Sequence, residues 1–216
     1  QSPYLLEDLV VFDTENSVYW SLETSLKAGD TCYFGEGDAF TQIPDYLYGS
    51  EWVKPYDPSK DYVADVLCSV DLSADAEMYI LYDAAASRPI WMDGWIKTGD
   101  TVLGDDDRQF NVYRKRYEGG STAEFGSGNS DCAMYIVAAK SCMSINEDLT
   151  LSEDMAISRN LYLDDGTIDL NGHTLTVQGN LIQSGGTIHI GSGQLQVNGD
   201  YRIQTEGVSA EDDTVS

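Results

Sequence analysis

A 20-residue repeat in the C-terminal third constrains the fold of this chain more than any other feature. Residues 160–179 and 180–199 follow one another directly, and eight aligned positions hold the same residue. Leu, Ile and Val recur at a fixed period between polar residues, and Gly and Asn recur where a chain would turn. The repeat predicts coils of a β-solenoid. The identical pairs are Asn160 and Asn180, Leu161 and Leu181, Gly166 and Gly186, Thr167 and Thr187, Ile168 and Ile188, Leu175 and Leu195, Val177 and Val197, and Gly179 and Gly199.

The repeat extends less regularly in both directions. Before it, an inward-facing set is expected at Leu149, Leu151, Met155 and Ile157, and after it the stretch 200–203 begins a further coil. We therefore predict about three coils of a right-handed β-solenoid over residues 141–206, followed by an acidic tail or linker at 207–216. Because the ends of solenoids require capping, the preceding domain or a continuation of the chain is expected to cap this one, and the chain is expected to be part of a longer protein.

The stretch from residue 8 to 140 has a different character. Short alternating segments such as 78–82, 110–113 and 134–137 are separated by clusters of Gly, Asp, Asn or Pro, and helical periodicity is nearly absent. The 14 Tyr and 20 Gly fit the same conclusion. The predicted fold class is all-β: an antiparallel β-sandwich joined to a short right-handed β-solenoid.

The charge balance excludes some partners. There are 37 Asp and Glu against 12 Lys and Arg, a net charge of −25, which would repel nucleic acid and anionic lipid. The one basic concentration is expected to form salt bridges with the surrounding carboxylates; it consists of Arg108, Arg114, Lys115 and Arg116. No apolar run is long enough to cross a bilayer, so no membrane insertion is expected.

The four cysteines indicate either disulfides or buried thiols. No two of them form a CxxC pair, and only two histidines exist, so a zinc site is not expected. An even number in an acidic β-protein suits an oxidising compartment, and the favoured pairing is Cys32 with Cys68 and Cys132 with Cys142. The alternative is four buried free thiols.

A series of motifs over about residues 8–140 resembles a known class of module. These motifs are Tyr19-Trp20-Ser21-Leu22, Leu26-Lys27-Ala28-Gly29-Asp30-Thr31, Phe40-Thr41-Gln42-Ile43-Pro44, Glu51-Trp52-Val53, Met78-Tyr79-Ile80-Leu81-Tyr82-Asp83, Arg88-Pro89-Ile90-Trp91-Met92, Trp95-Ile96-Lys97-Thr98-Gly99, Val112-Tyr113-Arg114-Lys115 and Met134-Tyr135-Ile136-Val137. Together they resemble the non-catalytic β-sandwich accessory modules of bacterial secreted polysaccharide lyases and other carbohydrate-active enzymes. The resemblance implies a secreted or cell-surface protein, a carbohydrate partner and no catalytic residues. The repeats, in turn, resemble those of Gram-positive surface and wall-associated proteins.

The residues themselves give no sign of a catalytic or metal site. With 37 acids, the proximity of two carboxylates is uninformative about glycoside hydrolysis. Both histidines, His173 and His189, lie in the repeat, where a structural role is expected. We therefore expect no enzyme activity and no cofactor. The alternative to a chain without a cofactor is a structural calcium ion at 105–107 or 164–166. Neither acidic turn has the spacing of an EF-hand loop.

Aromatic residues supply the functional hypothesis. Sugar rings present apolar C–H faces that stack on Trp and Tyr, while carboxylates accept hydrogen bonds from their hydroxyls. The segment 46–62 interleaves both types, and its predicted ligand-binding residues are Tyr46, Tyr48, Trp52, Tyr56 and Asp57. For Trp52 a core position is the alternative. The expected function is carbohydrate binding or adhesion within a larger surface or secreted protein; the alternatives are a purely structural wall-protein segment and a fragment of a polysaccharide lyase or glycoside hydrolase.

Overall fold

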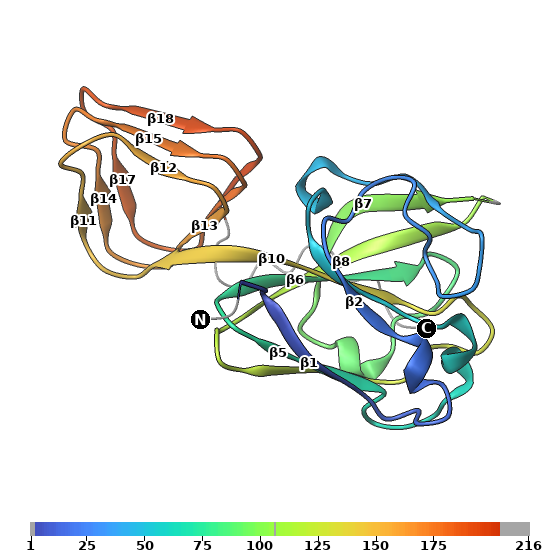
Figure 1. Ribbon diagram of the computed structural model, residues 1–216. Coiled ribbons are helices and arrows are strands. Elements are labelled where there is room, and N and C mark those ends of the chain that lie inside the picture. The colour runs from blue at the N-terminus through green and yellow to red at the C-terminus, as the bar shows by residue number, and fades with distance from the viewer. Residues whose placement is uncertain (1–2, 106, 204–216) are drawn as a thin grey trace. The chain divides into compact units, whose positions relative to one another are not determined.

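The computed structural model describes residues 3–105 and 107–203, shown in Figure 1. These residues form β-strands and short 3-10 helices, with no α-helix among them. They divide after Lys140 into two compact units, and each unit is described by itself. Within the described residues, no helix has the length and apolar character needed to cross a membrane.

The smaller sheet of the first unit consists of three antiparallel strands in the order β1-β5-β9. β5 (Cys68–Leu72) lies in the middle and is buried at four of its five residues, because both of its edges are covered. β1 (Leu6–Val11) and β9 (Thr122–Phe125) flank it. The carboxylate of Glu51 accepts hydrogen bonds from the backbone N–H groups of Leu5 and Leu6 at 2.8–2.9 Å and so holds the start of β1.

The larger sheet has the order β10-β6-β8-β7-β3 within the first unit and is curled. β6 (Ala76–Asp83) and β8 (Gln109–Tyr117) pair antiparallel over eight residue pairs, and β7 (Ile96–Gly104) pairs with the far edge of β8. The remaining strands are β3 (Phe40–Gln42), β4 (Glu51–Lys54) and β2 (Ser21–Glu23), with β4 pairing to both β2 and β10 (Ile136–Ile145).

One apolar core fills the first unit. Its largest fully buried side chains are aromatic or long and aliphatic, with Tyr33, Tyr79, Tyr135, Phe40, Phe110 and Phe125 among them. The prediction of an all-β chain is confirmed. The predicted antiparallel sandwich is not clearly shown, since the larger sheet is curled and its β4 pairs with β2 and β10 off the main strand order.

The second unit is a β-solenoid of about three turns, as predicted. Figure 1 shows its strands stacked in rows, one row being β12 (Met155–Ile157), β15 (Thr174–Val177) and β18 (Gln194–Val197). A second row is β11 (Leu149–Thr150), β14 (Thr167–Asp169) and β17 (Thr187–His189). The third contains β13 (Asn160–Leu163), β16 (Leu181–Gln183) and β19 (Tyr201–Ile203).

The register of the solenoid follows the repeat. Leu161 pairs with Leu181, Ile168 with Ile188 and Leu175 with Leu195, all in parallel strands and all 20 residues apart. Residues 200–203 do begin a further coil, because β19 pairs with β16. The inward set predicted for the first coil is confirmed, since its four residues lie in or against the solenoid core.

The predicted disulfides are wrong. None joins the four cysteines, all of which lie in the described part of the chain. Cys32 and Cys68 are packing residues of the core, and the Cys68 Sγ lies 3.9 Å from the Tyr135 hydroxyl oxygen. Burial raises the thiol pKa of each to about 12, so both are held as protonated thiols.

Candidate functional site

Three aromatic rings from separate loops gather on the surface of the first unit. Tyr19 closes the 3-10 helix η1 (Ser17–Tyr19), Phe34 lies in the loop before β3, and Tyr56 precedes the 3-10 helix η3 (Asp57–Asp61). The ring centroids are 5.2 Å apart for Tyr19 and Phe34, 4.7 Å for Tyr19 and Tyr56, and 6.4 Å for Phe34 and Tyr56. We call these three residues the aromatic platform.

Backbone pairing brings the three loops together. β2 and β4 pair antiparallel with Ser21 opposite Lys54, which places the residue before β2 close to the residue after β4. The backbone N–H of Phe34 donates to the Pro55 carbonyl at 3.0 Å and fixes the third ring beside Tyr56. The platform is therefore positioned by regular structure beneath it.

A buried chain of side-chain hydrogen bonds ties η1 to η3. Trp20 Nε1 donates to Ser59 Oγ at 3.1 Å, and Ser59 Oγ donates to Asp13 Oδ2 at 2.8 Å. Asn16 Nδ2 donates to the same carboxylate oxygen at 2.7 Å. Because Trp20, Ser59 and Asp13 are all buried, this chain resists rearrangement and holds the platform rigid.

Two of the platform rings are open to solvent. Tyr19 is 38% exposed and Phe34 45% exposed, while Tyr56 is half-buried beneath them. Aromatic residues normally bury most of their surface, so a cluster that keeps this much exposed has the composition of a ligand-contacting patch.

Charged side chains lie beside the platform in sequence and in space. Asp57 directly follows Tyr56; its Oδ2 pairs with Lys60 Nζ at 2.7 Å, and its Oδ1 accepts a hydrogen bond from the Met134 N–H at 2.9 Å. Two residues after Phe34, desolvation and then the charge of Asp57 raise the pKa of Glu36, while Arg108 opposes the rise. Both oxygens of Asp57 therefore have partners within the protein, and the partly exposed Glu36 is the carboxylate of this region that can accept a hydrogen bond from a polar ligand.

Arg108 is anchored inside this region. Its Nη2 lies 3.2 Å from Asp38 Oδ2, and its guanidinium carbon lies 5.2 Å from the centroid of the buried Tyr33 ring. The Tyr33 hydroxyl in turn donates to the Met134 carbonyl at 2.7 Å. Of the predicted salt-bridging cluster, Arg114 also pairs with a carboxylate, Glu77 Oε1, at 3.2 Å.

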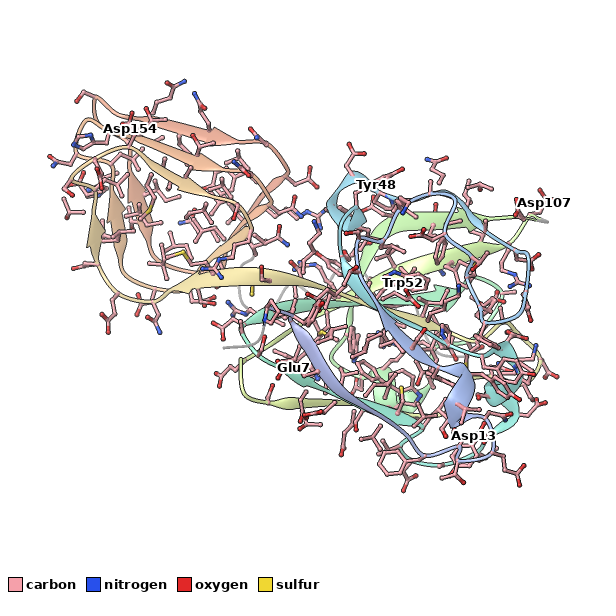
Figure 2. The ribbon with its side chains drawn as sticks, in the orientation of Figure 1. Glu7, Asp13, Tyr48, Trp52, Asp107 and Asp154 are labelled. Carbon is pink, nitrogen blue, oxygen red and sulfur yellow. The ribbon has the colours of Figure 1, made fainter. Side chains whose placement is uncertain are left out.

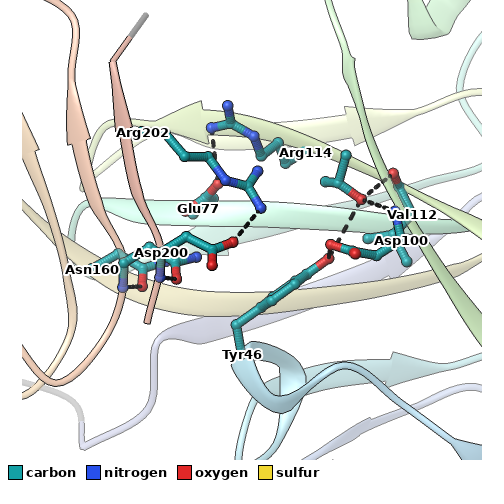
Figure 3. A network of polar contacts seen from close by, with 10 residues as sticks. Tyr46, Glu77, Asp100, Val112, Arg114, Asn160, Asp200 and Arg202 are labelled. Atoms are coloured by element: carbon teal, nitrogen blue, oxygen red, sulfur yellow. Dashed lines mark hydrogen bonds and ion pairs between the residues drawn. The ribbon is translucent and has the colours of Figure 1, made fainter. Parts of the chain in front are cut away.

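The structure distributes the sequence-predicted binding residues over several places. Tyr56 and Asp57 lie at the platform. Tyr46 packs its ring 5.4 Å from that of buried Tyr79. Its hydroxyl donates to Asp100 at 2.9 Å (Figure 3). Tyr48 lies at the surface of the first unit with 43% of its area exposed to solvent (Figure 2).

Trp52 occupies the core position that the sequence left as its alternative. It is 2% exposed and packs edge-on against Phe40 at 5.8 Å. Its Nε1 is buried without a hydrogen-bond partner among the described residues.

Tyr19 and Phe34 were not among the binding residues predicted from the sequence. One signal was available for Phe34, which precedes Gly35-Glu36-Gly37-Asp38, a stretch without an apolar residue to share a core face with it. No local signal marks Tyr19, because its role depends on the pairing of β2 with β4.

The two acidic turns considered for calcium have internal partners. Asp105 Oδ2 accepts the Ala39 N–H at 2.9 Å, and Asp164 Oδ1 accepts the Ser184 hydroxyl at 2.8 Å. In the described part of the chain, no group of three or more His, Cys, Asp or Glu side chains is arranged to hold a metal ion.

Comparison with known proteins identifies the fold but no family. No family model matches the chain, and no curated protein matches it. Among solved structures, a β-glucuronidase from glycoside hydrolase family 2 matches with a TM-score of 0.58 and 21% identity, over 65% of this chain and 15% of the β-glucuronidase. A glycoside hydrolase family 138 enzyme that targets pectin rhamnogalacturonan II matches with a TM-score of 0.41 and 11% identity, over 64% of this chain and 17% of that enzyme.

The likeness to the β-glucuronidase shows a shared fold and corrects one expectation. The chain was expected not to be an enzyme, and this is contradicted, because the fold occurs within a glycoside hydrolase. The chain spans only 15% of that hydrolase, so the likeness does not show activity for this chain either.

Proposed function

We propose that the first unit binds carbohydrate at the aromatic platform, as one domain of a larger carbohydrate-active protein that is secreted or displayed at the cell surface. The observation that carries the proposal is the set of three mutually packed rings, two of them exposed by 38% and 45%, on a rigid base. Flat rings of this kind stack against the C–H face of a pyranose. The occurrence of the same fold within a β-glucuronidase supports a setting in which glycans are the ligands.

Charged residues beside the three rings add polar groups to the proposed binding site. Glu36 is partly exposed and offers its carboxylate oxygens to sugar hydroxyls, while Asp57 holds Lys60 in place and Asp38 holds Arg108. Binding sites that combine apolar area with a few fixed polar groups orient a ligand as well as hold it. The charged residues beside the aromatic platform therefore favour a hydroxyl-rich ligand over a purely apolar one.

The proposal is tested by affinity electrophoresis on gels containing a panel of neutral and uronate-containing polysaccharides. Tyr19→Ala combined with Phe34→Ala should weaken retention on the responsive polysaccharide at least about tenfold, which corresponds to about 1.4 kcal/mol. Tyr19→Phe keeps the ring and should retain binding. Because both side chains are partly exposed, the double variant should unfold at nearly the wild-type temperature.

Tyr48→Ala is the matched control, because Tyr48 is exposed to a similar degree but lies outside the platform. Retention lost in Tyr48→Ala and kept in the platform variant would move the site to the loop that the sequence favoured. Absence of retention on every polysaccharide would reject the proposal.

A further inference from the structure

The three rings of the aromatic platform are inclined to one another. The planes of Phe34 and Tyr56 meet at 73°, and the plane of Tyr19 is tilted by 34° from that of Phe34 and by 44° from that of Tyr56. One ring can therefore stack on a pyranose while an inclined neighbour presents its face to a substituent of the same sugar. A cation is attracted to the face of an aromatic ring within about 6 Å of the centroid. Because the three centroids lie no more than 6.4 Å apart, a cationic substituent on the sugar can interact with more than one ring.

The carboxylate of Glu36 adds a negative charge in the same region. Glu36 is two residues from Phe34, and it interacts electrostatically with Asp57, the residue that follows Tyr56. It is partly exposed, and no hydrogen bond or ion pair from a described residue reaches its carboxylate. Glu36 is therefore open to a ligand of opposite charge.

The surroundings of Glu36 carry a negative balance. Asp38 and Asp57 act on it as like charges, whereas Lys60 and Arg108 act on it as opposite charges. Both cations already have carboxylate partners. Lys60 pairs with Asp57, and Arg108 pairs with Asp38.

This environment disfavours the ionised form of Glu36 unless a cation is added. Desolvation and then the charge of Asp57 raise the pKa of Glu36, which means that its negative charge is held at a cost. A bound ammonium group would reduce that cost, and a bound carboxylate would increase it. The net charge of −25 acts in the same direction at longer range.

We propose that the aromatic platform prefers sugars that carry a protonated amine, the hexosamines with a free amino group, over neutral sugars and uronates. The pyranose stacks on an exposed ring, while its ammonium group lies over an inclined neighbouring ring and forms an ion pair with the Glu36 carboxylate. The inference rests on the proposed function, because it assigns a ligand class to that same site. What it adds is the charge of the preferred sugar.

Isothermal titration calorimetry with oligosaccharides matched in length tests the proposal. The probes are glucosamine oligomers, the same oligomers after N-acetylation, and galacturonate oligomers, all at physiological salt and at a pH where the sugar amine is protonated and Glu36 is ionised. The wild type should bind the amine form at least about tenfold more tightly than the acetylated form. It should bind the galacturonate oligomers most weakly.

Glu36→Gln should bring the ratio of the affinities for the amine and acetylated forms close to one, because the ion pair with the ammonium group is lost. Glu124→Gln is the matched control, since Glu124 is an exposed carboxylate on β9 of the smaller sheet and its removal changes the net charge equally. The control should keep the wild-type ratio. Tyr19→Ala combined with Phe34→Ala should weaken the binding of both forms, which separates loss of the site from loss of its preference.

Equal binding of the amine and acetylated forms by the wild type would overturn this inference and leave the proposed carbohydrate site standing. Tighter binding of the galacturonate oligomers would also overturn it. So would a preference that Glu36→Gln and Glu124→Gln change alike, because the preference would then reflect net charge alone. Failure to bind any of the oligomers would reject the platform as a carbohydrate site, and the inference with it.

Discussion

The side chain of Asn160 accepts a hydrogen bond through Oδ1 from the backbone N–H of Asn180, one coil later, at 2.8 Å. Asn180 repeats the contact with the N–H of Asp200 at 2.9 Å, and Figure 3 shows both bonds. Both asparagines are buried, so each side chain satisfies a backbone donor inside the corner. The Gly preceding each bonded residue is required there, because a Cβ on Gly199 would lie 2.3 Å from Asn180 Oδ1.

Asn180→Ala should destabilise the solenoid by about 1–3 kcal/mol, because it removes the buried side chain that accepts the hydrogen bond from the N–H of Asp200. Chemical denaturation followed by circular dichroism measures the change. The control is Asn198→Ala, at an exposed position of the same coil, which should change stability by about 0.5 kcal/mol or less. Equal losses of stability at the two positions would show that the asparagine hydrogen bonds between coils do not stabilise the solenoid.

Leu175→Ala should cost more than Leu195→Ala, although the two residues are repeats of each other. Leu175 is fully buried between two coils, and its truncation should cost about 2–5 kcal/mol. Leu195 is half-buried in the third coil and has less burial to lose. Chemical denaturation of both variants gives the comparison, and a larger loss of stability at Leu195 would contradict the burial of the two residues.

Breaking the buried ion pair of the first unit should be far more costly than breaking an exposed one. Glu77 and Arg114 are both buried with their charged atoms 3.2 Å apart, so Glu77→Gln should destabilise the unit by about 3 kcal/mol. Lys27→Ala removes the solvent-exposed pair with Asp30 and should cost about 0.5 kcal/mol or less. Urea denaturation of both variants gives the comparison.

The buried thiols should make stability fall at alkaline pH. The folded state holds Cys68 protonated with a pKa of about 12, whereas in the unfolded chain the thiol ionises near its ordinary pKa of 9.0. From about pH 9 upward the unfolded state therefore binds fewer protons, and this thiol alone lowers the free energy of unfolding by up to about 1.4 kcal/mol per pH unit.

Stability measured against pH for the wild type and Cys68→Ala checks this, and the variant should show a shallower alkaline decline. A thiol titration is its companion: all four cysteines should react in denaturant without a reductant, and Cys32 and Cys68 should react slowly in the native state. Matching slopes in the two proteins would count against the shifted pKa.

The solenoid was predictable because its contacts obey a sequence rule. Leu161 meets Leu181 and Leu175 meets Leu195 at a constant separation, so alignment of the repeat with itself already gives the register. The irregular first coil shows the limit, because Cys142 pairs with Asn160 and Leu149 with Ile168, at separations of 18 and 19 residues that no repeat in the sequence reveals.

The aromatic platform was only partly predictable because tertiary pairing creates it. Tyr56 and Asp57 were found from local composition, whereas Tyr19 and Phe34 reach them through strand pairing and a backbone hydrogen bond. Local composition also did not reveal the surroundings of Tyr46, whose partly buried ring packs on Tyr79. Whether an aromatic ring is buried depends on strands that are distant in the sequence. The composition of the neighbouring residues therefore does not predict it.

Because paired residues of the solenoid are a constant 20 positions apart, the number of coils can change without disturbing the pairing. Side chain and backbone partners from β13 onward are joined across 20 positions, as in Leu161 with Leu181 and Asn160 with Asn180. Duplication or deletion of one whole 20-residue unit would give every remaining residue a partner of the kind it already has. Loss of any other number of residues would rotate the apolar positions away from the interior, so this part of the gene is expected to evolve by whole-unit steps.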